Sequence, residues 1–402
     1  MKSIKCILVF ALIIQNISAQ QNTMKDFAAT DKKALQIPDS LTSSTKTIAN
    51  FIQSNFATEQ EKVRAIFIWV ASNIQYDIEN MFAINYYATQ EDKINKALAT
   101  RKGICENYAA VFNNICLKCG IKCYVIEGYT KQNGAADFIP HAWCAAFINN
   151  TWLMFDPTWA SGFVNNGKFY KKINNNYFSA LPSALIKTHM PFDYLWQFLN
   201  YPVSNQEFYE GKTTQNTTKP FYNFVDSLKA YEAENHVEQL ISTAYRIEKN
   251  GVKNAMIFDR LQHIKVELEN NKIQIENERR NKLATLYNIA VAKYNNAVNN
   301  LNDFISYRNH QFLPQQPDSV IQNMIDTVNA EVSTAKAQLD QIENPDSTSA
   351  LLITQLYKAI KDISFHTQEQ QDWLSEYFSK SKSKRKSMFY EKKITWFGVP
   401  LN

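Results

Sequence analysis

Three side chains in this sequence have the types and the order needed for chemistry at a thiol. Cys105 follows Gly103 and opens an apolar stretch, and His141 and Asp156 come later in the chain. In nucleophilic thiol catalysis a thiolate attacks a carbonyl carbon, an imidazole moves the proton, and a carboxylate fixes the tautomer of the imidazole. A cysteine, a histidine and an aspartate are the minimum set for this reaction, so these three residues form the candidate site.

The helix that must position the cysteine is predicted from periodicity. Apolar residues recur at helical spacing after Cys105, and Gly120 is a suitable residue to end the helix. A cysteine in the first helical turn has backbone N–H groups directed at it, and the helix dipole favours a thiolate over a thiol. The placement of Cys105 therefore suits a nucleophile.

A pair of strands must position the other two residues. Residues 142–148 and 151–155 are rich in β-forming types, and Asn149-Asn150 between them mark a two-residue hairpin turn. A further strand is predicted over residues 121–129. The cysteine helix is therefore followed by a short antiparallel sheet.

The register of this hairpin places the base beside its carboxylate. With a two-residue turn, Asp156 lies opposite Trp143, which is two residues from His141 on the same face of its strand. Diagonal neighbours of this kind are roughly 7 to 8 Å apart at the backbone and within side-chain reach. The spacing predicts that His141 and Asp156 meet, and that Cys144 points to the opposite face.

The composition is that of a globular protein. The chain has 402 residues, of which 45% are hydrophobic, and a formal net charge of +5. This length allows two or three domains with substantial cores. The positive charge is too small and too localised for the broad basic surface typical of nucleic-acid binding, so no nucleic-acid partner is expected.

The first residues have the pattern of an export signal. Lys2 and Lys5 precede an apolar run over residues 6–14, and Ile17-Ser18-Ala19 fits a cleavage site. The run is shorter than the roughly 20 residues that a membrane span needs, and no later stretch is apolar enough to span. We predict a signal peptide at residues 1–19, an extracytoplasmic location, periplasmic or secreted, and no stable membrane insertion.

Removal of the signal leaves an odd number of cysteines in a compartment that permits disulfides. These are Cys105, Cys116, Cys119, Cys123 and Cys144. If Cys105 is the free thiol, the pairing of the other four is not determined by the sequence. The four could also bind zinc, but cysteine within an apolar helix and the strand after it is more often a small packed hydrophobe, so no metal or cofactor is predicted.

Composition and breaking residues divide the chain. The segments are a polar lead-in at residues 20–44, a domain holding the candidate site at 45–212, a linker at 213–220, a helical region at 221–380, and a basic tail with a short closing segment at 381–402. Helices are predicted over 45–55, 59–74 and 91–100 in the first domain. The tail is expected to be solvated.

The helical region has long 3.6-residue patterning with few glycines. Breaks fall at Gly251, near Pro314 and Pro317, and at Pro345. These breaks predict four or five helices, arranged either as an up-and-down bundle or as stacked helical hairpins.

Short motifs around the candidate residues resemble a known family. The three blocks of the transglutaminase-like superfamily are similar to Gly103-Ile104-Cys105-Glu106, His141-Ala142-Trp143 and Asp156-Pro157-Thr158-Trp159. Thr188-His189-Met190-Pro191 with Trp196-Gln197 is similar to the branch of the cytokinesis protein and kyphoscoliosis peptidase group. The resemblance covers about residues 45 to 210 and implies an α+β fold. Its papain-like core has N-terminal helices and a cysteine helix packed on an antiparallel sheet, here followed by an all-α region.

The resemblance also implies roles. By position in the blocks, Cys105 would be the nucleophile, His141 the general acid and base, and Asp156 the orienting carboxylate. The donors to an oxyanion stay open: the Cys105 N–H is one candidate, and Trp69 or Tyr76 another, although each ring also suits a core. The competing histidine, at position 189, is interpreted as a structural cap or a supporting residue.

Two classes of function follow from these predictions. The first is a secreted thiol enzyme that acts on protein or peptide amides through a Cys105 thioester, with hydrolysis favoured over transamidation because the resemblance implies that stand-alone, bacterial-looking members lean toward peptidase activity. The alternative is a non-catalytic module of the same fold, whose helical region binds a protein partner. The substrate and the oligomeric state are not determined by the sequence.

Overall fold

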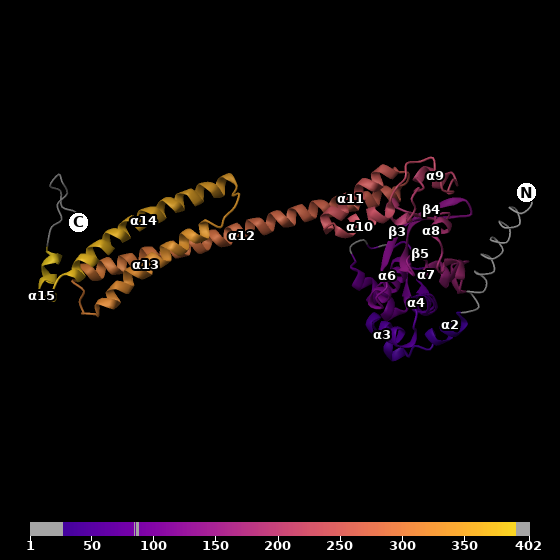
Figure 1. Cartoon of the computed structure of the whole chain (residues 1–402), viewed down its shortest axis with the longest axis horizontal. Helices are drawn as coiled ribbons and strands as arrows, with labels where there is room; N and C mark the ends of the chain where they lie inside the picture. The colour runs from indigo at the N-terminus through magenta and orange to yellow at the C-terminus, as the bar shows by residue number, and fades with distance from the viewer. Residues whose placement is uncertain (1–26, 84, 86–87, 391–402) are drawn as a thin grey trace, which may run out of the picture. The chain divides into compact units, whose positions relative to one another are not determined.

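The computed structural model describes residues 27–83, 85 and 88–390 (Figure 1). The chain divides into two compact units, Met1–Glu269 and Asn270–Asn402. The predicted signal peptide at residues 1–19 and the predicted closing segment at 391–402 lie outside the described residues. No helix among the described residues combines the length and the apolar character that crossing a membrane requires.

The described part of the predicted polar lead-in is folded. It forms α2 (Ala28–Ala34) and a 3-10 turn, η1 (Asp39–Leu41). Asp31 on α2 accepts two hydrogen bonds of 2.6 Å from the buried guanidinium of Arg64. A buried arginine needs a paired carboxylate, so this contact fixes a helix whose own apolar pattern is weak.

The four helices before the sheet lie close to their predicted ranges. They are α3 (Thr45–Asn55), α4 (Glu59–Asn73), α5 (Gln90–Thr100) and α6 (Cys105–Lys118). The first three begin at side-chain caps. The Ser44 hydroxyl accepts the Thr47 N–H, and Thr58 and Thr89 each form a capping box with the acidic residue three positions later.

The main sheet is antiparallel and has the strand order β5-β4-β3-β8. Its strands are β3 (Cys123–Gln132), β4 (Ala135–Ile148), β5 (Thr151–Phe155) and β8 (His189–Pro191). Asn149 and Asn150 both have positive φ, as a two-residue hairpin turn requires, and Ile148 pairs with Thr151. The predicted hairpin register is therefore confirmed.

Apolar side chains cover both faces of this sheet. On one face, Phe67 of α4 and Phe112 of α6 pack in one cluster with Cys144 and Phe155. On the other face, Trp143 packs in a second cluster. The sheet is thus held between two cores, with α6 on one side, as the α+β prediction requires.

Short elements complete this unit. They are the parallel pair β1 (Gln75–Tyr76) and β2 (Lys102–Gly103), then α7 (Pro157–Ser161), the hairpin β6 (Gly162–Asn165) and β7 (Lys168–Lys171), η2 (Asn175–Tyr177), α8 (Pro182–Leu185), η3 (Tyr194–Gln197) and α9 (Asn205–Tyr209).

The boundary between the two units, at Glu269, lies later in the chain than the predicted linker at residues 213–220. The helices α10 (Phe224–Ala233) and α11 (His236–Asn250) and the first turns of α12 (Ala255–Asn309) belong to the first unit. Ile247 and Ile257 share a buried cluster with Tyr129 of β3 and Met190 of β8. The apolar faces of these helices are therefore covered by the sheet-bearing unit.

The second unit is helical, as predicted. It contains the rest of α12 together with α13 (Asp318–Leu339) and α14 (Ser347–Ser379), which lie side by side with it (Figure 1). The tail begins with α15 (Lys382–Arg385) and η4 (Lys386–Phe389). Arg385 bonds both carboxylate oxygens of Asp318 at 2.9 Å and Met388 is buried, so these two side chains are packed. Lys382, Lys384 and Lys386 are exposed, as expected for a solvated tail.

Gly128 of β3 should tolerate no side chain. An ideal Cβ there would lie 2.1 Å from the Met190 carbonyl oxygen and 2.7 Å from a ring carbon of Trp143. Gly128→Ala is expected to lower the free energy of unfolding by about 1–3 kcal/mol, because the neighbouring strand and the indole must shift. Chemical denaturation measures this, and a variant within about 0.5 kcal/mol of wild type would contradict the tight packing.

Candidate active site

Cys105 is the first residue of α6, as predicted, and its side chain is 6% exposed. The side chain of Asn107 fixes this turn: its Oδ1 accepts the Ile104 N–H at 2.9 Å, and its Nδ2 donates to the Lys93 carbonyl at 3.0 Å. Cys105 Sγ lies 3.9 Å from the carbonyl oxygen of Pro140 on β4. The thiol is thus held at the start of the helix, next to the strand that carries His141.

The hairpin brings His141 and Asp156 together. Asp156 directly follows β5 and is the N-cap of α7, and its Oδ2 lies 2.9 Å from His141 Nε2. The Cys105 side chain also lies near the His141 ring and helps to raise its pKa. The structure therefore brings the three predicted residues together, with His141 hydrogen-bonded to Asp156 and next to Cys105.

The carboxylate of Asp156 is fully engaged. Its Oδ1 accepts the backbone N–H groups of Thr158 at 2.9 Å and Trp159 at 3.0 Å, which are the free donors at the start of α7. Its Oδ2 contacts Nε2 of both His141 and His189, the second at 3.1 Å. A fully buried carboxylate with this set of donors is held in position and kept ionised.

His189, interpreted from the sequence as a structural cap or a supporting residue, contacts the carboxylate of the site. It begins β8 and is fully enclosed, with Nδ1 2.8 Å from the Thr188 hydroxyl and Nε2 on Asp156. Burial lowers the pKa of His189 although Asp156 acts to raise it, so the ring is neutral. A neutral ring that donates from Nε2 to Asp156 and accepts the Thr188 hydroxyl at Nδ1 satisfies both nitrogens.

The two histidines differ in charge because their neighbours differ. Burial alone would lower the pKa of His141, but Asp156 and the Cys105 side chain raise it to about 10. Burial also acts to raise the pKa of Asp156, and the two imidazoles together hold it well below its usual range. At neutral pH the site therefore holds an imidazolium at His141 between the Cys105 sulfur and the Asp156 carboxylate.

Aromatic rings enclose the two imidazoles. The Trp143 ring is stacked on His141, with centroids 6.1 Å apart, and its centroid lies 5.1 Å from that of His189. Trp159 lies 5.5 Å from His141 and 4.6 Å from His189. Rings on these sides exclude water from Asp156, which strengthens its interaction with His141.

Of the two rings considered for an oxyanion, Tyr76 lies by the thiol. Tyr76 in β1 pairs with Gly103 in β2, two residues before Cys105. Burial raises the pKa of Tyr76, and the nearby charges of Cys105 and Asp156 raise it further, so the phenol keeps its proton. Trp69 instead lies on α4 and packs in the buried hydrophobic cluster of the first unit.

The charges of the site predict how stability depends on pH. The stabilisation from His141 is complete below its usual pKa of 6.5 and is lost as the pH rises through about 10. The stabilisation from Asp156 is present above its usual pKa of 3.8 and is lost as the pH falls through its lower folded value. The difference in unfolding free energy between wild type and His141→Ala should therefore be largest between these limits and shrink toward pH 10. Denaturant titrations across this range measure it, and a difference that grows above pH 7 would contradict the assigned charges.

The four other described thiols are free and buried. They are Cys116, Cys119, Cys123 and Cys144. Cys144 lies 3.4 Å from the Ala109 carbonyl of α6, and burial raises the pKa of its thiol well above the usual range. Among the residues that the structure describes, the group with metal-ligand atoms close together is His141, Asp156 and His189, not these cysteines. Its two Nε2 atoms are already bonded to Asp156 Oδ2, so these atoms serve as donors to the carboxylate.

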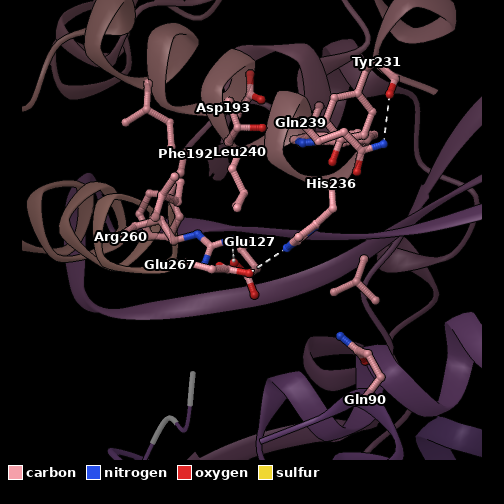
Figure 2. Close-up of a pocket in the computed structure, with 15 residues that line it drawn as sticks. Gln90, Glu127, Phe192, Asp193, Tyr231, His236, Gln239, Leu240, Arg260 and Glu267 are labelled. Atoms are coloured by element: carbon pink, nitrogen blue, oxygen red, sulfur yellow. Dashed lines mark hydrogen bonds and ion pairs between the residues drawn. The ribbon is translucent and has the colours of Figure 1, made fainter. Parts of the chain in front are cut away.

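A separate cavity of about 290 Å³ lies between β3, α11 and the start of α12 (Figure 2). Its charged side chains face one another: Arg260 pairs with Glu127 at 3.0 Å, and His236 pairs with Glu267 at 2.9 Å. The cavity therefore holds pairs that balance each other's charge, whereas the nucleophile and its base lie together at Cys105.

Known proteins match the part of the chain that carries this site. The family model described as Transglutaminase-like superfamily matches residues 46–157. Kyphoscoliosis peptidase of Mus musculus is 34% identical over 160 residues, covering 38% of this chain and 24% of the relative. Cytokinesis protein 3 of Saccharomyces cerevisiae is 25% identical over 160 residues, covering 37% of this chain and 18% of the relative.

A solved structure is similar to part of this chain at a low TM-score. The periplasmic domain of TgpA from Pseudomonas aeruginosa is 25% identical with a TM-score of 0.24, covering 33% of this chain and 47% of that chain. This chain spans about a quarter or less of the length of the two curated relatives above.

Proposed function

We propose that the protein is a thiol enzyme that acts on protein or peptide amides through a thioester at Cys105. The match of residues 46–157 to the family model of the transglutaminase-like superfamily supports this proposal. One observation carries the proposal: His141 lies next to the Cys105 side chain and is hydrogen-bonded to the buried Asp156. A thiol next to an imidazole whose far nitrogen is fixed by a carboxylate is the arrangement that activates a cysteine nucleophile.

The proposed reaction has two steps. In the first, the Cys105 sulfur, its proton held on His141, attacks the amide carbon, so that a C–S bond forms. The C–N bond then breaks as His141 gives its proton to the leaving nitrogen. In the second, water or an amine attacks the thioester carbon and loses a proton to His141, and the C–S bond breaks to restore the thiolate–imidazolium pair.

The oxyanion of each tetrahedral intermediate needs donors. The backbone N–H of Cys105 is directed outward at the start of α6, and the Tyr76 phenol keeps its proton at neutral pH. We assign these two groups as the donors. Tyr76→Phe should then lower kcat about tenfold to a hundredfold with little change in KM, because an oxyanion donor acts in the transition state. An unchanged kcat would remove Tyr76 from this role.

His189 is proposed as a positioning residue that acts through Asp156. His189→Ala removes one donor from the carboxylate and should lower kcat/KM about tenfold to a hundredfold, as loss of an outer-shell partner commonly does. His189→Gln keeps an N–H donor and should recover most of the activity. Equal losses in both variants, with both proteins folded, would contradict this role.

Hydrolysis is the favoured outcome, and the substrate is a protein or peptide. The proposal includes export, which is supported by the signal pattern at residues 1–19. The non-catalytic alternative is favoured by exposed apolar side chains on the helical unit, such as Leu351 and Phe365 of α14, which suit a protein partner.

The test compares wild type with Cys105→Ala on a library of peptides from a digested proteome. Mass spectrometry reads both new chain termini and new isopeptide cross-links. New termini in the wild-type sample support hydrolysis, and cross-links support transamidation. Cys119→Ala removes a free thiol outside the site and should behave as wild type. Identical products from wild type and Cys105→Ala would overturn the enzyme proposal.

A further inference from the structure

Two exposed phenylalanines are stacked on each other, and one of them is two residues from Pro140, whose carbonyl contacts Cys105. Phe82 is 66% exposed and Phe138 is 80% exposed, yet their ring centroids lie 6.4 Å apart with planes only 14° from parallel. A ring pair left this open to water gains little for stability. Single exposed apolar residues are common, but a stacked pair beside a reactive group needs an explanation.

A bulge in β4 presents Phe138 to solvent. Tyr129 pairs with Pro140 and Lys131 pairs with Ala136, so residues 137–139 of β4 lie opposite Thr130 alone. The side chain of Asp137 turns back and accepts hydrogen bonds from Thr130 and Gln132. Bulges of this kind often re-aim a side chain next to an active site, and here the re-aimed side chain is Phe138.

Both rings are tied to the immediate surroundings of the thiol. Phe138 is two residues from Pro140, whose carbonyl contacts Cys105 Sγ at 3.9 Å. Phe82 lies in a turn whose start is fixed by the Asp77 N–H donating to the Gly103 carbonyl at 3.0 Å, and Asn80 bonds the Asp77 carboxylate at 2.8 Å. The polar groups of the two segments that carry Phe82 and Phe138 are thus bonded within the protein. The two rings remain as the exposed surface of these segments.

A second pair of exposed rings is tied to the same site. Phe163 and Tyr170 of the β6–β7 hairpin stack with centroids 5.6 Å apart. The ring centroids of Phe169 and Tyr76 lie 6.3 Å apart, and Lys171 Nζ donates a hydrogen bond to the Ser72 carbonyl. These contacts fix the hairpin beside β1. The edge of the site therefore carries aromatic surface on more than one segment.

We infer that the Phe82–Phe138 pair is a binding subsite for a large apolar or aromatic side chain of the peptide substrate, close to the carbonyl that Cys105 attacks. The inference rests on the proposed function for the identity of the occupant as a substrate. An apolar side chain laid on the pair would remove both rings from water and gain ring–ring contact, which is worth about tenfold in binding.

The test measures binding without chemistry. The full-length Cys105→Ala protein is titrated with a fluorescein-labelled octapeptide that has central Phe-Leu in a Gly-Ser-Gln frame, and with the same peptide carrying Asp-Ser instead. We expect about tenfold tighter binding of the apolar peptide, and loss of most of this preference when Phe138→Ala or Phe82→Ala is added. Phe221→Ala, which removes a 62% exposed ring paired with Tyr201, is the matched control and should keep the preference.

The outcomes separate the subsite from the enzyme proposal. A preference that is absent in the Cys105→Ala protein, or that survives both ring substitutions, overturns the subsite. Turnover of the same peptides by wild type is measured in parallel. Preferential binding without turnover would contradict the proposed function while supporting the apolar site.

Discussion

His141→Ala should lower kcat/KM for the amide substrate by about 10⁴ to 10⁶. In the proposed mechanism, His141 carries the proton that leaves the Cys105 thiol and that the departing amine must receive. Its ring is hydrogen-bonded to Asp156 and lies next to Cys105. The loss should appear mainly in kcat, because the imidazole acts on the reacting atoms.

The control for His141→Ala is a histidine substitution away from the thiol. His236 lies in the separate cavity, where it pairs with Glu267 (Figure 2). His236→Ala should keep kcat/KM within about twofold of wild type, because surface pairs contribute little. If His141→Ala retained more than about a hundredth of the activity, His141 would not be the general acid and base.

Asp156→Asn should lower kcat/KM by about 10⁴, while the free energy of unfolding falls less than this loss of activity would correspond to. The amide oxygen can still cap α7 by accepting the Thr158 and Trp159 N–H groups. The amide nitrogen would then face the Nε2 atoms of His141 and His189, so that donors meet donors. To relieve this, His141 must lose its Nε2 proton, and this loss removes the imidazolium.

Asp193→Asn is the matched control for this substitution. Asp193 is also buried, caps η3 through the Leu195 N–H at 2.9 Å, and binds Arg246 at 2.8 Å. Its replacement should lower the unfolding temperature, as loss of a buried charge pair does, while the folded protein keeps its activity. Equal losses of kcat/KM in the two variants would mean that Asp156 acts through stability alone.

Local sequence signals were sufficient for the part of the site that depends on short-range geometry. The Asn149-Asn150 turn fixes the β4–β5 register, and the register places His141 beside Asp156. The helical pattern after Gly103 places Cys105 in the first turn of α6. In both cases the deciding contacts form between residues close in the chain, so periodicity and turn chemistry determine them.

Long-range packing determined what the sequence did not reveal. His189 reaches Asp156 only because β8 joins the sheet beside β3, and nothing in residues 188–191 specifies that partner. The ion pair of Asp31 with Arg64 likewise folds the lead-in across 33 positions. The amphipathic patterns of α10 and α11 predicted helices but not the surface that buries them.

The most direct test of the central claim is the alkylation rate of Cys105 by iodoacetamide, followed by mass spectrometry in wild type and in His141→Ala at pH 6 to 9. A deprotonated sulfur paired with the His141 imidazolium predicts fast, nearly pH-independent labelling of Cys105 in wild type, at least about a hundredfold faster at pH 6 than in His141→Ala. The buried Cys116 and Cys144 should stay unlabelled in both proteins. Equal Cys105 rates in wild type and His141→Ala would contradict an activated thiol and, with it, the proposed enzyme.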